Sequence, residues 1–291
     1  MADELRVKPN DVARGVRAPR PQIPAWIVGE FFGTFLLVFF GCGSVAAAVL
    51  TGAQVGIFQV AIVWGLGIAT AIYLTGSLSG AHLNPAVTCA LATCGNFPPR
   101  RVIPYVAVQL AGAFVAAAVL HGAFAGSLAA YESAHAIVRG APGSEASAMI
   151  FGEFFPNPGG KPFTDELRVV ASPWTAFLVE ALGTAVLVLV IFGVTDARNA
   201  SRPRELTPLT VGLTVTVLIS LFAPLTQAGF NPARDLGPRL WSAIFGGWGG
   251  WPFAANGWGW LTVYVIAPLA GGQVGGILHR IFFRPAYARR P

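Results

Sequence analysis

The tripeptide Asn-Pro-Ala occurs twice in this chain of 291 residues, as Asn84-Pro85-Ala86 and as Asn231-Pro232-Ala233. Asn is a preferred N-cap residue, and Pro suits the first helical position because its missing N–H would have no partner there. One such tripeptide is therefore most simply the start of an ordinary helix. If each Asn oxygen caps its own helix, however, the side-chain amide is left free to donate hydrogen bonds into a pore.

Arg234 follows the second tripeptide and would lie in the first turn of that helix. A cation there opposes the helix dipole, so helix stability alone would not select it. Arg234 either pairs with Asp235 or a loop carboxylate, or it lines a constriction as a fixed donor that repels cations. Asp235 is less diagnostic, because an acid is favoured in the first turn and Arg239 follows four residues later. A local Asp235–Arg239 pair explains it as well as a solute contact does.

Glu30, Glu180 and His82 are ionisable side chains among apolar residues. Such residues are costly in a membrane, so each implies a partner or a role. The two Glu residues could carry protons in a coupled transporter, but their matching positions favour a buried structural role as acceptors for non-helical backbone. His82 could serve an enzyme or a metal, but no second ligand or nucleophile is spaced with it. We expect it to brace the adjoining loop, and we expect no cofactor and no metal site.

The composition places these residues in a membrane protein. Hydrophobic residues make up 54% of the chain and charged residues 11%, with a mean hydropathy of +0.62. A soluble protein carries roughly 25% charged residues, so a cytosolic enzyme is a poor interpretation. The net charge of +6 could suggest a nucleic-acid partner, but no cluster of basic and aromatic residues supports one.

Six apolar runs are long enough to cross a bilayer, which takes about 20 residues per helix. They lie near 24–50, 56–77, 102–126, 173–195, 206–225 and 260–283. Two shorter apolar segments, 84–94 and 231–244, are expected to enter the membrane without crossing it. The predicted divisions are a flexible basic tail (1–23), a channel domain (24–283) and a second tail (284–291). Within the domain, the two repeats (24–126 and 173–283) flank a long external loop (127–172).

The basic residues gather near alternate span ends: in the N-terminal tail, at Arg100 and Arg101, between Arg198 and Arg204, and after Arg280. Positive charge marks the cytoplasmic side. An even number of spans with both termini in the cytoplasm fits this distribution.

The two halves of the domain repeat each other. Glu30-Phe-Phe-Gly33-Thr34 begins the first half and Glu180-Ala-Leu-Gly183-Thr184 the second, and each precedes its Asn-Pro-Ala by a similar distance. Three spans per half is an odd number, so the second copy must be inverted. The predicted fold is all-α: six transmembrane helices plus two re-entrant half-helices in an inverted 3+3 repeat. The half-helices would meet cap to cap at the membrane centre, where their positive ends reject cations while neutral polar solutes pass.

With these motifs and the run Ser79-Gly-Ala-His-Leu-Asn-Pro-Ala-Val-Thr88 in place, residues 24–283 resemble the aquaporin, or major intrinsic protein, family. The resemblance implies one pore per subunit, usually in a homotetramer, within the plasma membrane. Asp235, Arg239 and the pair Pro268-Leu269 are similar to the glycerol-facilitator branch, which implies glycerol and water as solutes.

The resemblance also assigns a selectivity filter. Trp64 and Arg234 match the filter of glycerol facilitators, although a Trp near a span end is also a common interface anchor. Ile219 and Ala228 depart from it, because that branch carries a small residue and an aromatic at these positions. The combination is similar to nodulin-26-like channels, which implies neutral metalloid acids such as arsenite, silicic or boric acid as alternative solutes. We expect glycerol, and disfavour a water-only pore because Ala228 leaves no second aromatic to narrow the filter.

Overall fold

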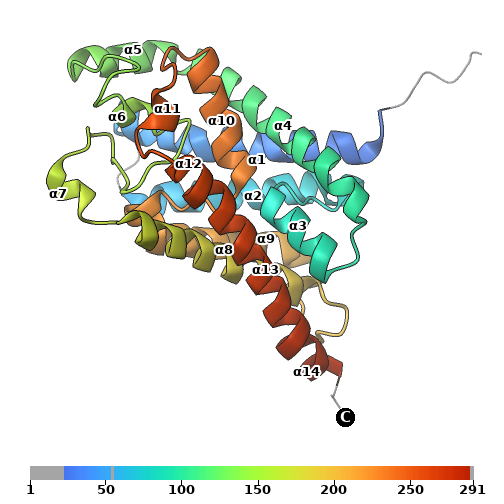
Figure 1. The fold of residues 1–291 in the computed structure, drawn as a ribbon. Coiled ribbons are helices and arrows are strands. Elements are labelled where there is room, and N and C mark those ends of the chain that lie inside the picture. Colours follow the sequence, from blue (N-terminus) through green and yellow to red (C-terminus); the bar gives the residue numbers. More distant parts are fainter. Residues whose placement is uncertain (1–22, 54–55, 289–291) are drawn as a thin grey trace, which may run out of the picture.

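The computed structural model describes residues 23–53 and 56–288, and the described chain forms a helical bundle (Figure 1). Most of the predicted N-terminal tail (1–23) lies outside these residues, as do residues 289–291 of the second tail. The short helices α5, α6, α7 and α11 gather at one end of the bundle, at the left of Figure 1, and α14 lies at the opposite end.

Six helical segments in the described chain are long and apolar enough to span a membrane, as the sequence predicts. The first repeat supplies α1 (Ala25–Thr51), α2 (Ile57–Ser79) and the turn η2 (Pro99–Arg101) continued by α4 (Val102–Ala123). The second supplies α8 (Pro173–Thr195), the turn η3 (Arg204–Leu206) continued by α9 (Thr207–Thr226), and a final segment, Gly259–Ala288. That segment comprises α12 (Gly259–Leu261), the π-helical η4 (Thr262–Ile266), α13 (Ala267–Leu278), the π-helical η5 (His279–Phe283) and α14 (Arg284–Ala288). It therefore continues past residue 283, where the sequence placed the start of the second tail.

The two half-helices are α3 (Pro85–Cys94) and α10 (Pro232–Ile244). Each starts with Pro in its first turn, where a missing N–H costs no hydrogen bond. Each also packs on a long helix of the other repeat, since α3 lies against α13 and α10 lies against α4. The repeats are therefore interlocked.

Glycines bring α2 and α9 into backbone contact across the bundle. A Cβ added at Gly65 would lie 2.5 Å from the carbonyl oxygen of Gly212, and a Cβ at Gly212 would meet the carbonyl oxygen of Gly65. Small residues at such crossings let helix backbones approach closely in a membrane. This contact matters for the site, because α2 carries Trp64 and α9 carries Ile219.

We expect Gly212→Leu to separate these two helices and to lower the yield of monodisperse protein. Overpacking a tight contact costs about 1–3 kcal/mol, and here the opposing atom is backbone and cannot rotate away. Size-exclusion chromatography after heating in detergent measures the effect. Gly76→Leu on α2 is the matched control, since nothing lies within 4 Å of a Cβ at Gly76. Equal stability of the two variants would contradict the argument.

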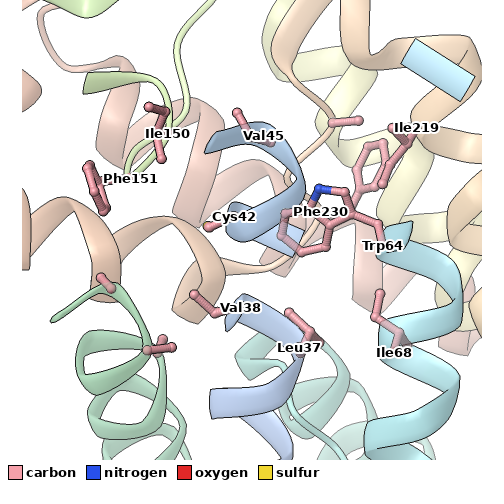
Figure 2. Close-up of a cluster of buried hydrophobic side chains, with 14 of the residues drawn as sticks. Leu37, Val38, Cys42, Val45, Trp64, Ile68, Ile150, Phe151, Ile219 and Phe230 are labelled. Carbon is pink, nitrogen blue, oxygen red and sulfur yellow. The ribbon is translucent and has the colours of Figure 1, made fainter. Parts of the chain in front are cut away.

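The segment predicted as a long external loop (127–172) contains three short helices: α5 (Ala125–Ala134), α6 (Glu145–Ala148) and α7 (Asp165–Arg168). Its middle part, residues 144–155, is buried, and Ile150, Phe151 and Phe154 join the main apolar core (Figure 2). The connection before the last span, which holds α11 (Trp251–Ala254), lies against α6. The loop is thus a structural layer that folds back into the bundle.

Candidate functional site

Both half-helices begin at an Asn that caps its own helix. Asn84 Oδ1 accepts from the Ala86 N–H at 2.8 Å. Asn231 Oδ1 accepts from the N–H groups of Ala233 at 3.0 Å and Arg234 at 3.3 Å. These are the N-cap bonds that the repeated tripeptide predicts.

The side-chain amides of these two residues tie the half-helices together crosswise. Asn84 Nδ2 donates to the Phe230 carbonyl at 2.8 Å, and Asn231 Nδ2 donates to the Leu83 carbonyl at 2.9 Å. The expectation that both amides are wholly free was therefore wrong. An amide NH₂ has two hydrogens, so each Asn retains one N–H, and both residues line the same cavity.

Glu30 and Glu180 hold the irregular backbone that precedes each half-helix. Glu30 accepts from the N–H groups of His82 (2.9 Å) and Leu83 (2.8 Å). Glu180 accepts from the N–H groups of Gly229 (3.0 Å) and Phe230 (2.7 Å). Both carboxyl groups are fully buried. These contacts support the structural interpretation of the two Glu residues, and their engaged oxygens give a proton-carrier role no support.

The backbone held in this way has the same unusual shape in both repeats. Ala81 and Leu83 have φ angles of 47° and 52°, and their counterparts Ala228 and Phe230 have 62° and 52°. Residues other than glycine seldom adopt this left-handed region, so the surrounding bonds must hold them there. No donor in the described chain reaches the carbonyl oxygens of residues 81, 82, 228 and 229, and all four residues line the cavity. Residues 81–82 and 228–229 therefore each present free carbonyl oxygens as hydrogen-bond acceptors, one pair before each half-helix.

Two cavities meet at a constriction. The central cavity contains both Asn caps. The loop-side cavity is lined partly by two loop residues, Met149, which is buried, and Asn157, which is half-buried. The residues common to both cavities are Trp64, Ile219 and Arg234. Three of the four predicted filter residues therefore lie together at the narrowing between the cavities.

Packing around Trp64 and Ile219 determines the shape of the constriction. Figure 2 shows Trp64 and Ile219 grouped beside Phe230. Gly41 on α1 leaves room for the indole, because a Cβ there would run into the Trp64 ring. Ala228, the fourth predicted filter residue, is buried and lines the central cavity but not the loop-side one. The small Ala228 side chain therefore leaves space in the central cavity and does not narrow the constriction itself.

Arg234 is buried at this narrowing, with 3% of its surface exposed. Its guanidinium carbon lies 4.7 Å from the centre of the Trp64 ring, within cation–π range. Its Nε pairs with Glu153 Oε1 at 2.9 Å. No acceptor in the described chain reaches its Nη1, although the residue lines both cavities. Arg234 therefore places a buried, unpaired guanidinium nitrogen beside the constriction.

Of the two pairing partners predicted for Arg234, the loop carboxylate is present as Glu153, whereas Asp235 pairs with Arg239 instead. Arg239 Nη2 lies 2.7 Å from Asp235 Oδ1, and Arg239 Nε lies 2.9 Å from Asp235 Oδ2. The same carboxylate accepts from the Glu153 N–H at 2.7 Å. The local pair that the spacing predicts is present, and it anchors the loop above the filter. Pro268 and Leu269 lie in the first turn of α13 and line neither cavity.

His82 braces the segment before α3. Its Nδ1 lies 3.2 Å from Thr88 Oγ1, and its ring packs against Phe97 and Tyr105. No group of three potential metal ligands occurs in the part of the chain that the structure describes. His82 also lines the central cavity, so it combines a structural contact with a place on the pore wall.

Sequence reasoning did not identify two site residues. It allowed a loop carboxylate as the partner of Arg234 without singling out Glu153, and it did not consider Gln227, which immediately precedes Ala228. Gln227 Oε1 accepts from the Phe154 N–H at 2.8 Å, and its Nε2 donates to the Met149 carbonyl at 3.1 Å. An available signal was the apolar run Ala146-Ser-Ala-Met-Ile-Phe-Gly-Glu-Phe-Phe155, which is unusual for a solvated loop and contains a single carboxylate.

Comparison with known proteins gives consistent matches over nearly the whole chain. Residues 20–279 match the family model described as "Major intrinsic protein". The glycerol uptake facilitator protein of Pseudomonas aeruginosa is 39% identical over 267 residues, covering 91% of this chain and 90% of that protein. The protein of the same name from Escherichia coli K12 is 41% identical, covering 90% and 88%. The X-ray structure of the aquaglyceroporin from Plasmodium falciparum aligns with a TM-score of 0.75 and 29% identity, covering 91% and 99%.

Proposed function

Because the chain belongs to the major intrinsic protein family, we propose that it is a passive channel for glycerol and other small uncharged polar solutes, together with water. It is a channel and not an enzyme. Relatives named as glycerol uptake facilitators, about 40% identical over nine-tenths of the chain, support glycerol as the solute. Protons and ions are excluded.

One observation carries this proposal: the lining of the central cavity combines two chemically different sets of groups. The apolar set consists of branched aliphatic side chains, among them Leu37, Ile68, Leu187, Ile191, Val211 and Val215. The polar set consists of the free carbonyl oxygens, the two Asn amides and Arg234. A polyol matches both sets, since its hydroxyl groups bond to the polar groups while its C–H groups contact the apolar side chains. A monovalent cation loses its hydration without replacement next to a fixed guanidinium.

Neutral metalloid acids are the second candidate. Ala228 favours them, because a methyl group where glycerol facilitators carry an aromatic leaves space on the central side of the constriction. A boric or arsenious acid molecule presents hydroxyl groups without an aliphatic backbone, so it uses the polar lining groups alone. Glycerol remains the first candidate because both the polar and the apolar lining groups contribute to its passage.

The expected setting is a homotetramer in the plasma membrane with both termini in the cytoplasm. The clusters of basic residues near alternate span ends support this orientation. Exposed apolar side chains along the spans, such as Leu66, Leu182 and Val217, provide the surface for lipid or for neighbouring subunits.

Stopped-flow light scattering on proteoliposomes tests the function. Inward gradients of glycerol, ribitol and boric acid are compared with sucrose, which should not enter. Fast re-swelling in glycerol with a low activation energy is expected. Water-driven shrinkage without glycerol entry would contradict the proposal and would mean that Ile219 closes the filter.

We expect Ala228→Phe to make the pore more selective by size. A ring added to the central side of the constriction should lower ribitol flux by about tenfold relative to glycerol flux, as a steric penalty of about 1–3 kcal/mol implies. Ala111→Phe on the exposed side of α4 is the control for adding a ring to the protein. An unchanged ribitol-to-glycerol ratio would show that residue 228 does not limit solute size.

A further inference from the structure

Glu153 is a buried carboxylate to which the proposed passage of solute assigns no role. It is 1% exposed, and its Oε1 lies 2.9 Å from Arg234 Nε. No hydrogen-bond donor in the described chain satisfies either of its oxygens, so the ion pair with Arg234 is its main compensation. A buried charge without a partner is strongly unfavourable. Glu153 and Arg234 therefore each hold the other in place and in its charged form.

The chain makes specific room for this carboxylate. Glu153 N–H donates to Asp235, and its carbonyl oxygen accepts from Arg239 Nη2, so its backbone is fixed to α10 at both polar groups. Its side chain then lies against Gly229, where a Cβ would collide with Oε2. The absence of a side chain at Gly229 thus leaves space for the Glu153 carboxylate to contact Arg234. Glu153 itself lines neither cavity, so solute does not touch it.

We infer that Glu153 is a positioning residue that sets the charge of the filter: its carboxylate neutralises Arg234 and fixes the guanidinium at the constriction. The other buried charges are already compensated, since Asp235 pairs with Arg239 and Glu180 accepts bonds from Thr226 and the strained backbone. The filter therefore rejects ions of both signs by dehydration. Loss of Glu153 leaves a net positive constriction, which continues to repel cations and becomes permeable to small anions. This inference rests on the proposed channel function.

The test uses full-length protein in proteoliposomes, with chloride flux driven by valinomycin and a potassium gradient and followed by a chloride-sensitive dye. Glycerol re-swelling is measured on the same vesicles. We expect Glu153→Gln to raise chloride flux by at least about tenfold, because the guanidinium charge at the constriction then attracts an anion without an opposing carboxylate. Glu153→Asp should restore the low flux, and Glu153→Gln combined with Arg234→Gln should abolish the gain.

Glu166→Gln is the matched control, since it makes the same chemical change at an exposed position of the same loop. A Glu153→Gln channel that conducts glycerol but has wild-type chloride flux would overturn the inference. Failure of wild-type protein to conduct glycerol would instead count against the proposed function, and the chloride comparison would still report the charge of the filter.

Wild-type protein offers a second test that needs no variant. Burial raises the pKa of the Glu153 carboxyl, and the adjacent Arg234 opposes that rise. As the pH falls through this pKa the carboxyl becomes neutral, so chloride flux should rise towards acid pH, and a flat profile would overturn the inference. In Glu153→Gln that dependence should disappear. The other titratable groups facing Glu153 are Asp235 and Arg239 on α10, Glu180 on α8, Cys42 on α1 and Tyr264 on η4.

Discussion

Arg234→Ala is expected to admit protons and monovalent cations, with a leak at least about a hundredfold above that of the wild type. The substitution removes the positive charge from the constriction, and the buried Glu153 carboxyl, 2.9 Å from the lost Nε, becomes neutral because a buried carboxylate without a partner takes up a proton. The lost guanidinium charge contributes about 4 kcal/mol at 4 Å and an effective dielectric constant of 20, which sets the scale of the effect. Acidification of vesicles that contain a pH-sensitive dye, under an imposed potential, measures the leak.

The same reasoning supplies a control. Adding Glu153→Gln to Arg234→Ala should leave the cation leak unchanged, because the buried carboxyl is already neutral once Arg234 is absent. Arg168→Ala, at an exposed arginine on α7, should leave the leak unchanged. A wild-type leak in Arg234→Ala would mean that the converging half-helix ends exclude cations without the guanidinium.

Glu180→Ala is expected to destabilise the folded protein by about 2–6 kcal/mol. The N–H groups of Gly229 and Phe230 lose their acceptor in the bundle interior, and each unsatisfied buried donor costs about 1–3 kcal/mol. The Thr226 hydroxyl also loses its partner at 2.6 Å. Without these bonds, Ala228 and Phe230 have little reason to keep positive φ angles. Loss of monodisperse protein on heating in detergent measures the effect.

Glu166→Ala, at an exposed position, should stay within about 0.5 kcal/mol of the wild type. The experiment also separates a channel from a coupled transporter. If Glu180→Ala folded with wild-type stability but lost pH-driven accumulation of solute, the carboxyl would be a proton carrier and the structural account would be wrong.

The sequence predicts those parts of the fold that obey short-range rules. Spans follow from apolar length, and the starts of α3 and α10 follow from an N-cap Asn with Pro in the next position. Because the two halves share their motifs, the matching roles of Glu30 and Glu180 could be inferred from their positions alone. The same is true of the Asp235–Arg239 pair, which needs only helical spacing.

The features that sequence reasoning missed depend on contacts between distant segments. Glu153 lies 81 positions from Arg234 in the chain and reaches it only because the loop folds back into the bundle. The bond from Asn84 to the Phe230 carbonyl likewise joins opposite repeats. Helical periodicity and capping preferences describe neighbours along the chain, so they carry no information about either contact.

The interlocking of the repeats has a consequence for biosynthesis. The half-helix α3 packs on α13, and its Asn84 bonds to a carbonyl at Phe230, so its final partners are made long after it leaves the ribosome. At 5–20 residues per second, the interval between synthesis of α3 and of α13 is roughly ten to forty seconds. Throughout that time the polar start of α3 and the strained residues beside it lack their final contacts. The first repeat must therefore wait at the translocon or in a wetter, shallower position, and insertion becomes complete only when the last span arrives.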